Sequence, residues 1–365
     1  MPDTVTSAEF QRALRPLLLD AVASGVTPGA QLALSLGGCN PLVIAVGTLD
    51  STADRSVTVD TVYDLASLTK PLTALAAVRL AETGVLSLDE PIGALWPQRF
   101  AERIAALRLD ALLSHRAGLP GWVAAFESVS LAECGSPEAR ARVLDVVAAV
   151  PLTAAGTALY SDLGYILAGE ALAQRAGATV DAVVRQQVIT PLGLGALQWR
   201  GVGERWRDAS VAPTERCPWR GRVVQGEVHD ENAYALGGIA GHAGLFGTAT
   251  AIAALGRACL TALRGESAWM SGRAVEAMIV ARSGGTHRLG WDGVSAGASS
   301  SGQHFGPRAF GHLGFTGTSV WCEPDRDLVV ALVTNRVHPS RESVGIRALR
   351  PQVHDAIIDL LRRNP

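Results

Sequence analysis

The sequence predicts an α/β protein of the α+β kind, in which helices flank an antiparallel sheet and a large helical part is inserted into the chain. Two observations predict this: short apolar, β-branched runs occur near both ends, and the long middle has the pattern of helix and loop. We therefore assign residues 1–85 and 284–365 to a sheet domain and residues 86–283 to a mainly helical domain. The junction between them is the natural place for a cleft.

The N-terminal elements follow from hydrophobic periodicity and turn residues. Two apolar runs on either side of a Gly37-Gly38 pair are typical of a β-hairpin. At Ser67 the apolar period changes from that of a strand to that of a helix, which Gly84 ends. The expected elements are a helix over 7–24, strands over Gln31–Leu36 and Leu42–Thr48, an extended segment over Val57–Leu65 and a helix from Ser67.

The C-terminal elements complete the sheet. Thr318–Cys322 and Leu328–Thr334 are apolar runs joined by the turn Pro324–Asp327, which predicts a second hairpin. A last helix is expected over about Ser343–Arg363. Strands at both ends of the chain predict a single sheet built from the two termini.

Composition excludes several classes of protein. Among the 365 residues, 48% are apolar and 18% charged, and 32 Lys+Arg against 34 Asp+Glu leave a net charge of −2. This balance argues against binding to nucleic acid or an anionic membrane. The uncharged stretch Ala21–Leu49 is interrupted by glycines and prolines, so it is not a membrane span. The N-terminus has the pattern of an amphipathic helix and not of a signal peptide, so we expect a soluble, cytoplasmic protein.

Metal and cofactor motifs are not found in the sequence. The five cysteines are dispersed without C-x-x-C spacing, which favours reduced thiols over a disulfide framework. His229-Asp230-Glu231 resembles a metal cluster, but adjacent residues rarely converge on one ion. Neither G-x-x-x-x-G-K-[ST] nor H-E-x-x-H occurs. We expect no metal and no organic cofactor.

One lysine, Lys70, stands among 32 cationic residues that are otherwise arginine. It follows Ser67 in an S-x-x-K pattern at the start of the predicted helix, where residues i and i+3 share a face. The hydroxyl and the amine can therefore come within hydrogen-bond distance. Alone, this pattern is also typical of a helix N-cap followed by a solvated lysine. Arginine cannot replace an amine that must be neutral part of the time, since its pKa stays above about 12.

Two further motifs follow along the chain. Tyr160-Ser161-Asp162 lies in the helical middle, and Gly311–Gly317 (GHLGFTG) directly precedes the strand that begins at Thr318. With S-x-x-K these motifs resemble the serine β-lactamase and penicillin-binding-protein superfamily, in particular its class C β-lactamase and esterase-like branch, which has S-x-x-K, Y-x-N and K-T-G or H-x-G in this order. The segment Leu112–Pro120 (LLSHRAGLP) is similar to that family as well.

The resemblance implies the β-lactamase/transpeptidase-like fold and a role for each matching residue. Ser67 would be the nucleophile that forms an acyl-enzyme. Lys70 and Tyr160 would exchange its proton, for which the site should lower the pKa of both. The remaining positions implied are an oxyanion hole from the backbone N–H groups of Ser67 and Phe315, and substrate contacts from Asp162, His312 and Gly314.

The sequence departs from this pattern at two positions. Asp162 stands where class C β-lactamases have asparagine, and an ionised carboxylate cannot donate a hydrogen bond to a substrate carbonyl. Near Lys70 it would also favour the charged amine; alternatively, it turns away to cap the following helix. His312 stands where a lysine is common, which removes a permanent cation and would hold a substrate carboxylate less firmly.

These observations predict a serine hydrolase that acts on a small-molecule ester or amide, with carboxylesterase-type activity expected first. The alternatives are a β-lactamase or D-amino-acid peptidase, and an acylated sensor or transacylase with slow turnover. Of the remaining candidates, we expect His115 to make structural hydrogen bonds and Trp291 to pack in the core. His242 either lines the cleft or packs its glycine-rich loop.

Overall fold

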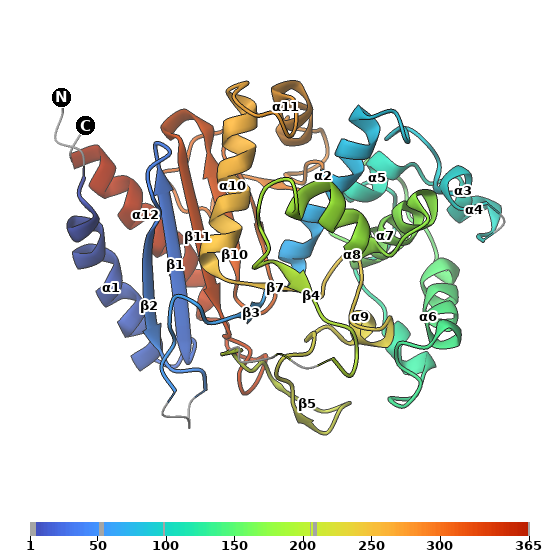
Figure 1. Cartoon of the computed structure of the whole chain (residues 1–365), viewed down its shortest axis with the longest axis horizontal. Coiled ribbons are helices and arrows are strands. Elements are labelled where there is room, and N and C mark those ends of the chain that lie inside the picture. Colours follow the sequence, from blue (N-terminus) through green and yellow to red (C-terminus); the bar gives the residue numbers. More distant parts are fainter. Residues whose placement is uncertain (1–4, 51–54, 98, 205, 207–209, 364–365) are drawn as a thin grey trace.

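The structure, a computed structural model, describes residues 5–50, 55–97, 99–204, 206 and 210–363 (Figure 1). Its centre is a six-stranded antiparallel sheet in which two strands from the start of the chain lie beside four strands from its end. The order is β2 (Leu42–Gly47), β1 (Gly29–Leu36), β11 (Leu328–Thr334), β10 (Ser319–Glu323), β9 (Phe310–Leu313) and β8 (Asp292–Gly293). The predicted antiparallel sheet built from both termini is confirmed.

Both predicted hairpins are present in this sheet. In β1, Leu32 pairs with Ile44 of β2 on one side and with Leu332 of β11 on the other. The prediction of an extended segment over Val57–Leu65 was wrong in length, because only Tyr63–Asp64 pair as a strand, β3. A turn interrupts it, in which the Thr61 N–H donates to Thr58 O and the Thr61 hydroxyl accepts from Thr58 N–H.

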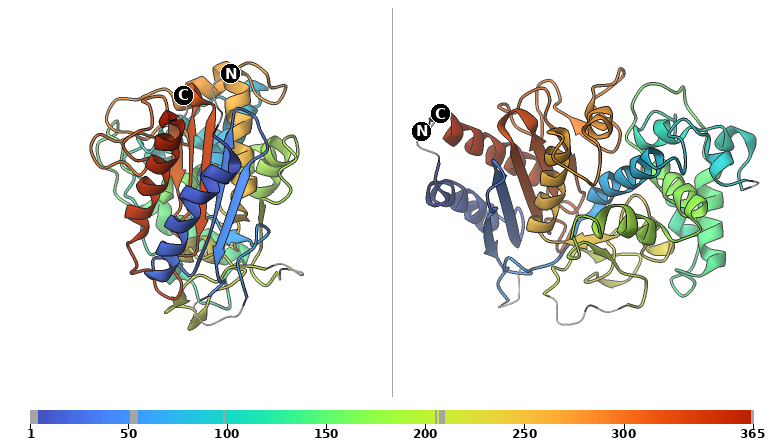
Figure 2. Two further views of the ribbon diagram at one scale, coloured as in Figure 1. Left: turned by 90° about the vertical axis from the view of Figure 1, so that its left-hand side faces the viewer. Right: turned by 45° about the horizontal axis from the view of Figure 1, so that its top comes forward.

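Helices cover both faces of the sheet. Alternate side chains of β11 point to opposite faces, and all of them are buried, so both faces need a covering layer. The first and last helices, α1 (Ser7–Ala23) and α12 (Ile346–Arg363), lie side by side on one face (Figure 2) and pack on Leu328, Val330 and Leu332. The other face, with Val329, Ala331 and Val333, packs against α10 (Ala249–Leu263). The sheet is therefore the middle layer of three.

The helical body joins the edge of this sandwich and is organised around a buried helix, α2 (Thr69–Glu82). Helix α2 packs on α7, α8 and η3, so it is held by neighbouring elements of the body. The other helices are α3 (Ile92–Leu95), α4 (Glu102–Ala105), α5 (Leu109–Leu113), α6 (Pro137–Ala149), α7 (Asp162–Ala176), α8 (Val180–Val184), α9 (Glu231–Ala235) and α11 (Gly272–Ile279).

Short elements connect the body to the sheet. A three-stranded sheet joins β3 to β7 (Leu245–Gly247) and β4 (Gln198–Trp199), and β5 (Arg216–Cys217) pairs with β6 (Arg222–Val223). The short helical turns are η1 (Ala66–Leu68), η2 (Ala125–Ser128), the π-helical η3 (Arg185–Ile189) and η4 (Pro324–Arg326). Strand β3 and turn η1 lead directly into α2.

Two helices pack across the predicted division of the chain. Helix α10 belongs by sequence to residues 86–283 but packs on the sheet, whereas α2 belongs to residues 1–85 and packs among the helices of the body. The division at residues 85 and 284 stays a prediction. All five cysteines lie in the described part and are free thiols. Within that part, no helix combines the length and the apolar character needed to cross a membrane.

Candidate active site

Ser67 is the middle residue of the short helical turn η1, which leads directly into α2. The residue before it, Ala66, has a φ of +48°, in the left-handed region that side chains other than glycine rarely adopt. The Ser67 hydroxyl oxygen accepts a hydrogen bond from Lys70 Nζ at 2.8 Å. The structure therefore brings the S-x-x-K serine and lysine together.

Lys70 is completely buried, and its amine is surrounded by polar partners. Besides Ser67 Oγ, its Nζ lies 2.6 Å from Asp162 Oδ1 and donates to the backbone carbonyl of His242 at 3.1 Å. Burial acts to lower the pKa of Lys70, but the carboxylate of Asp162 and the phenol of Tyr160 outweigh it, so the pKa is raised above its ordinary value. The ammonium form is thus the resting state of the amine.

Tyr160 lies beside this pair, with its ring centroid 4.9 Å from Lys70 Nζ. Burial raises the pKa of Tyr160, and the ammonium of Lys70 opposes that shift only in part. The sequence-based expectation that the site lowers the pKa of both groups was therefore wrong. For Lys70 the physical reason is Asp162, because its negative charge favours the ammonium. For Tyr160 the main reason is burial, to which the negative charge of Asp162 adds.

Asp162 is the first residue of α7, and its carboxylate points to Lys70. The alternative that it turns away to cap this helix was wrong, because the cap is the preceding residue: Ser161 Oγ accepts from Gly164 N–H at 3.3 Å and donates to Pro120 O at 2.6 Å. With the cap supplied by Ser161, the neighbouring carboxylate is free to pair with the lysine.

His312 lies on β9, on the other side of Tyr160, with 6.1 Å between the two ring centroids. Burial and the charge of Lys70 lower the pKa of His312 to about 3, so the imidazole is neutral at neutral pH. Its Nδ1 lies 2.8 Å from the carbonyl of Leu313. Because a carbonyl only accepts, the proton is on Nδ1, and Nε2 is left as an acceptor.

Each of the three motifs contributes residues to the lining of one cavity of about 640 Å³, although Lys70 lies behind Ser67 and does not line it. At Gly314 a side chain would collide with Leu65 O and Thr318 Oγ1, so only glycine fits between β9 and the nucleophile turn. Phe315, whose N–H is the second predicted oxyanion donor, is 49% exposed. The lining residues are Ala66, Ser67, Trp122, Tyr160, Asp162, His229, Asp230, Glu231, Ala243, His287, Asp292, His312, Leu313, Gly314, Phe315, Arg336, Arg341, Val344, Ile346, Arg347 and Arg350.

Four arginines in the lining were missed by the sequence analysis, although four within fifteen residues were a usable signal. Arg350 donates to Gly314 O and Thr318 O, and burial together with Arg336 lowers its pKa to about 9. Arg341 is paired with Glu215 and Glu231. In the described part of the chain, no carboxylate forms an ion pair with Arg336, Arg347 or Arg350. This wall of the cavity thus presents guanidinium groups that are not held in ion pairs within the described residues.

A histidine that the sequence did not single out, His287, also borders the cavity. Its ring centroid lies 5.6 Å from that of Tyr160, and its Nδ1 is 3.5 Å from Asp292 Oδ1. His115 accepts a hydrogen bond from Ser161 N–H at 3.0 Å and stacks near Tyr160, which fits its expected structural role. No sequence spacing links His287 to Tyr160, so only the folded chain reveals the contact.

Two of the remaining sequence candidates, His242 and Trp291, lie outside the cavity. His242 is buried and its Nε2 lies 2.9 Å from Asp230 Oδ1, so it packs its loop and presents its carbonyl to Lys70. Trp291 is buried against Phe310, with ring centroids 5.1 Å apart, as expected for a core residue.

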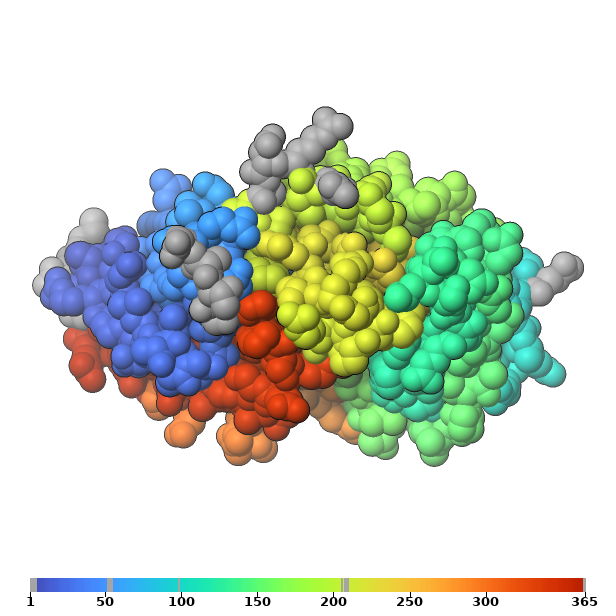
Figure 3. All heavy atoms as spheres, turned by 90° about the horizontal axis from the view of Figure 1, so that it is seen from below, coloured from blue at the N-terminus to red at the C-terminus, as the bar shows by residue number. Residues whose placement is uncertain are grey.

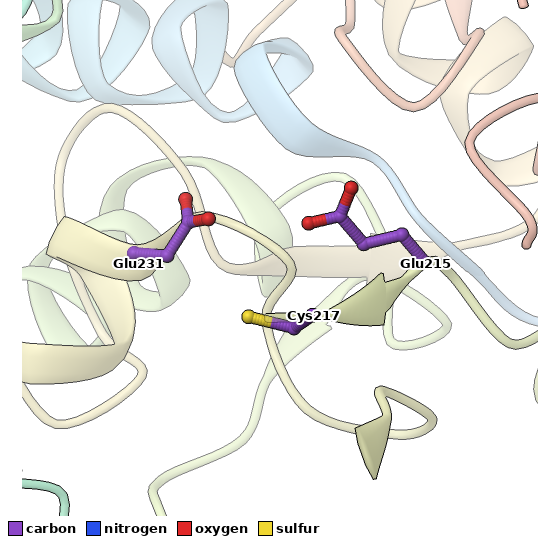
Figure 4. A group of neighbouring side chains, drawn as sticks. All are labelled: Glu215, Cys217 and Glu231. Carbon is purple, nitrogen blue, oxygen red and sulfur yellow. The ribbon is translucent and has the colours of Figure 1, made fainter. Parts of the chain in front are cut away.

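Glu215, Cys217 and Glu231 converge closely enough to hold a metal ion (Figure 4). Arg341, however, forms a bidentate pair with Glu215 and also bonds Glu231. Burial alone would raise the pKa of Glu215, but Arg341 and His229 hold it at about 2. The cluster is therefore an ion-pair network, in which Arg341 links the segment after β11 to the segment around residues 215–231. Figure 3 shows these two segments in contact, in red and yellow.

The antiparallel sheet with its helical layers and the hydrogen-bonded pair of Ser67 and buried Lys70 define a β-lactamase/transpeptidase-like protein. The β-lactamase family model matches residues 14–354, so the chain belongs to the β-lactamase family and is a serine hydrolase of that family. The fold expected from the resemblance is confirmed.

Two curated relatives align over most of the chain. N-acetylmuramyl-L-alanine amidase of Bacillus subtilis (strain 168) is 30% identical over 304 residues, which cover 76% of this chain and 68% of the relative. A putative D-alanyl-D-alanine carboxypeptidase of Escherichia coli (strain K12) is 28% identical over 307 residues, covering 77% and 70%. Among solved structures, EstCE1, described as a hydrolase with promiscuous acyltransferase activity, shares the fold, with a TM-score of 0.75 at 19% identity over 97% of this chain and 100% of that one.

Proposed function

We propose that the protein hydrolyses small esters or amides that carry a negative group, through an acyl-enzyme on Ser67. The observation that carries this proposal is the 2.8 Å hydrogen bond between Lys70 Nζ and Ser67 Oγ, at a cavity that Ser67 lines. A serine hydroxyl needs a neighbouring base to become a nucleophile, and the amine and the phenol of Tyr160 are the groups beside it.

In acylation, the Lys70–Tyr160 pair first loses a proton to solvent and then takes the Ser67 proton, while Ser67 Oγ bonds to the substrate carbonyl carbon. The tetrahedral intermediate collapses when the leaving alcohol or amine receives that proton, which leaves an ester on Ser67. Water then attacks this ester and gives a proton to the same pair. The pair returns that proton to Ser67 Oγ as the acid leaves, which regenerates the free serine. The backbone N–H groups of Ser67 and Phe315 would stabilise the oxyanion in both steps.

The arginines of the cavity support an anionic substrate. Arg336 and Arg347 form no ion pair in the described part of the chain, and Arg350 holds the carbonyl of Gly314. Although His312 is neutral, these guanidinium groups supply the positive charge that its lysine counterpart would provide. A carboxylate on the substrate is the simplest group to match them.

The substrate bond is either an ester or an amide. The neutral imidazole of His312 and the carboxylate of Asp162, which cannot donate to an amide carbonyl, support carboxylesterase-type activity. The names of the two relatives, an amidase and a putative carboxypeptidase, support amide or peptide cleavage and with it the β-lactamase or D-amino-acid peptidase alternative.

A second candidate is a protein that acylates but turns over slowly. The observation in its favour is the Lys70–Asp162 contact at 2.6 Å, which keeps the amine charged and so weakens the base that must activate water. An acyl group on Ser67 would then persist.

A labelling and turnover experiment tests both candidates. The protein is treated with a fluorophosphonate probe and fluorescent penicillin, and hydrolysis is followed with p-nitrophenyl esters, D-amino-acid amides and D-alanyl-D-alanine. Labelling that Ser67→Ala abolishes, together with sustained product release, supports the hydrolase. A burst without turnover supports the slowly deacylating protein. If neither probe labels Ser67, the proposed acyl-enzyme is wrong.

A further inference from the structure

Asp64 lies three residues before the nucleophile, at the end of β3, and is 2% exposed. Its two carboxylate oxygens have separate backbone partners. Oδ1 accepts from Ala66 N–H at 2.8 Å, and Oδ2 accepts from His229 N–H at 2.6 Å. One side chain thus joins the nucleophile turn to the loop before α9, far away in the sequence.

The bond to Ala66 acts where the backbone is strained. Ala66 has a φ of +48°, a conformation that is unfavourable for residues that carry a Cβ. The neighbouring structure must hold such a residue in place, and its amide is held by Asp64. Ser67, the next residue, lines the cavity, and α2 begins two residues after Ser67.

A second set of bonds holds the same segment from the β9–β10 loop. Thr316 Oγ1 donates to the carbonyl of Asp64 at 2.7 Å, and Thr318 Oγ1 donates to that of Leu65 at 3.0 Å. Phe315 lies in this loop and stacks on His229, with ring centroids 5.6 Å apart. The two residues that would form the oxyanion hole, Ser67 and Phe315, are therefore linked through Asp64 and its partners.

We propose that Asp64 is a positioning residue: its carboxylate holds the left-handed turn at Ala66 and, through His229, sets Ser67 and Phe315 at the separation that the oxyanion hole requires. Asp64 does not line the cavity, so it acts on the nucleophile turn and not on the substrate. This inference rests on the proposed acyl-enzyme at Ser67.

The test is a double-mutant cycle read by the rate of fluorophosphonate labelling of Ser67. In Asp64→Asn, an NH₂ group replaces one acceptor oxygen and faces one of the two N–H donors, so labelling and kcat should fall by about 10²-fold while KM changes little. Glycine adopts positive φ without strain, so adding Ala66→Gly to Asp64→Asn should restore about tenfold of this loss. Glu170→Gln is the matched control, since it changes another buried carboxylate, paired with Arg140, away from the cavity.

Each outcome bears on the inference. The inference is supported if Asp64→Asn is labelled slowly and the double variant recovers. The labelling rate of Glu170→Gln should then lie within about twofold of wild type. Normal labelling by Asp64→Asn overturns it, and so does slow labelling without recovery, because that is the result of a merely structural role. If the wild-type protein is not labelled at all, the proposed function is wrong instead.

A measurement on the wild-type protein covers the case in which Asp64→Asn does not fold. The Ala66 and His229 amides should exchange with deuterium at least about 10³-fold more slowly than in an unfolded chain, because a buried carboxylate accepts both. Exchange of the Ala66 amide at the unfolded-chain rate overturns the inference.

Discussion

Lys70 and Asp162 form an ion pair of 2.6 Å in which the lysine side chain is fully buried and that of the aspartate is 18% exposed. The lysine comes from the first turn of α2 and the aspartate from the first residue of α7, so the pair joins two helices at the cavity. It explains why the only lysine of the chain is raised in pKa despite its burial. Because this contact favours the charged amine, and only the neutral amine can accept the Ser67 proton, the charge of Lys70 controls the proposed reaction.

Lys70→Arg should abolish acylation while keeping the positive charge. A guanidinium with a pKa above about 12 cannot accept the Ser67 proton. We expect the rate of p-nitrophenyl ester hydrolysis and of fluorophosphonate labelling to fall by about 10²- to 10⁴-fold, which is the usual contribution of a general base.

The matched control is Arg79→Lys, the reverse exchange on the same helix, where Arg79 pairs with Glu82 at the surface. Its labelling rate should be that of the wild type. Near-normal turnover by a folded Lys70→Arg protein, judged by its thermal unfolding, would show that the lone lysine is not the base.

Asp162→Asn should shift the acid limb of the pH–rate profile to lower pH. The carboxylate of Asp162 raises the pKa of both Lys70 and Tyr160, so its removal lowers both. More of the pair is then deprotonated at neutral pH, and kcat/KM should rise at the acid end. The amide can also donate to a substrate carbonyl, so nitrocefin hydrolysis should rise relative to ester hydrolysis. An unchanged profile and an unchanged substrate ratio would show that Asp162 sets neither property.

The parts of the site that the sequence could predict are those carried by contiguous motifs. Ser67 and Lys70 share a helical face by their spacing, and the turn residues around β1, β2, β10 and β11 define two hairpins. Each depends on local geometry, which side-chain type and spacing determine.

The parts that the sequence could not predict depend on which distant groups meet. Whether Asp162 caps its helix or pairs with Lys70 depends on Ser161, which takes the cap. The direction of the Lys70 pKa shift depends on the balance of burial against that carboxylate, two large opposing effects. The second bond of Asp64, to His229, joins residues that no local pattern relates.

His354 should make the protein less stable in acid. It is fully buried, and burial lowers its pKa to about 4, whereas an unfolded chain gives histidine about 6.5. The unfolded state therefore binds more protons as pH falls from about 6.5 to about 4, and the free energy of unfolding falls with it, by about 1.4 kcal/mol per pH unit.

His354→Asn removes this titration and retains a donor for the carbonyl of Ser300, which His354 Nδ1 approaches at 2.9 Å. Urea unfolding between pH 7 and pH 4 should show a shallower loss of stability for the variant than for the wild type. Equal slopes would mean that His354 is not the group that titrates on unfolding in this range.

Arg347→Ala should weaken binding of anionic substrates selectively. Arg347 is exposed at the start of α12 and lines the cavity, and in the described part of the chain no carboxylate competes for its guanidinium. For a carboxyphenyl ester we expect KM to rise by about tenfold, the effect of losing one charge-assisted contact, with little change in kcat. The matching uncharged phenyl ester should be hydrolysed as before. Arg363→Ala, at the far end of the same helix, is the control and should leave KM for both esters unchanged. If Arg347→Ala changes KM for the carboxyphenyl ester no more than Arg363→Ala does, the arginines of the cavity do not select the substrate.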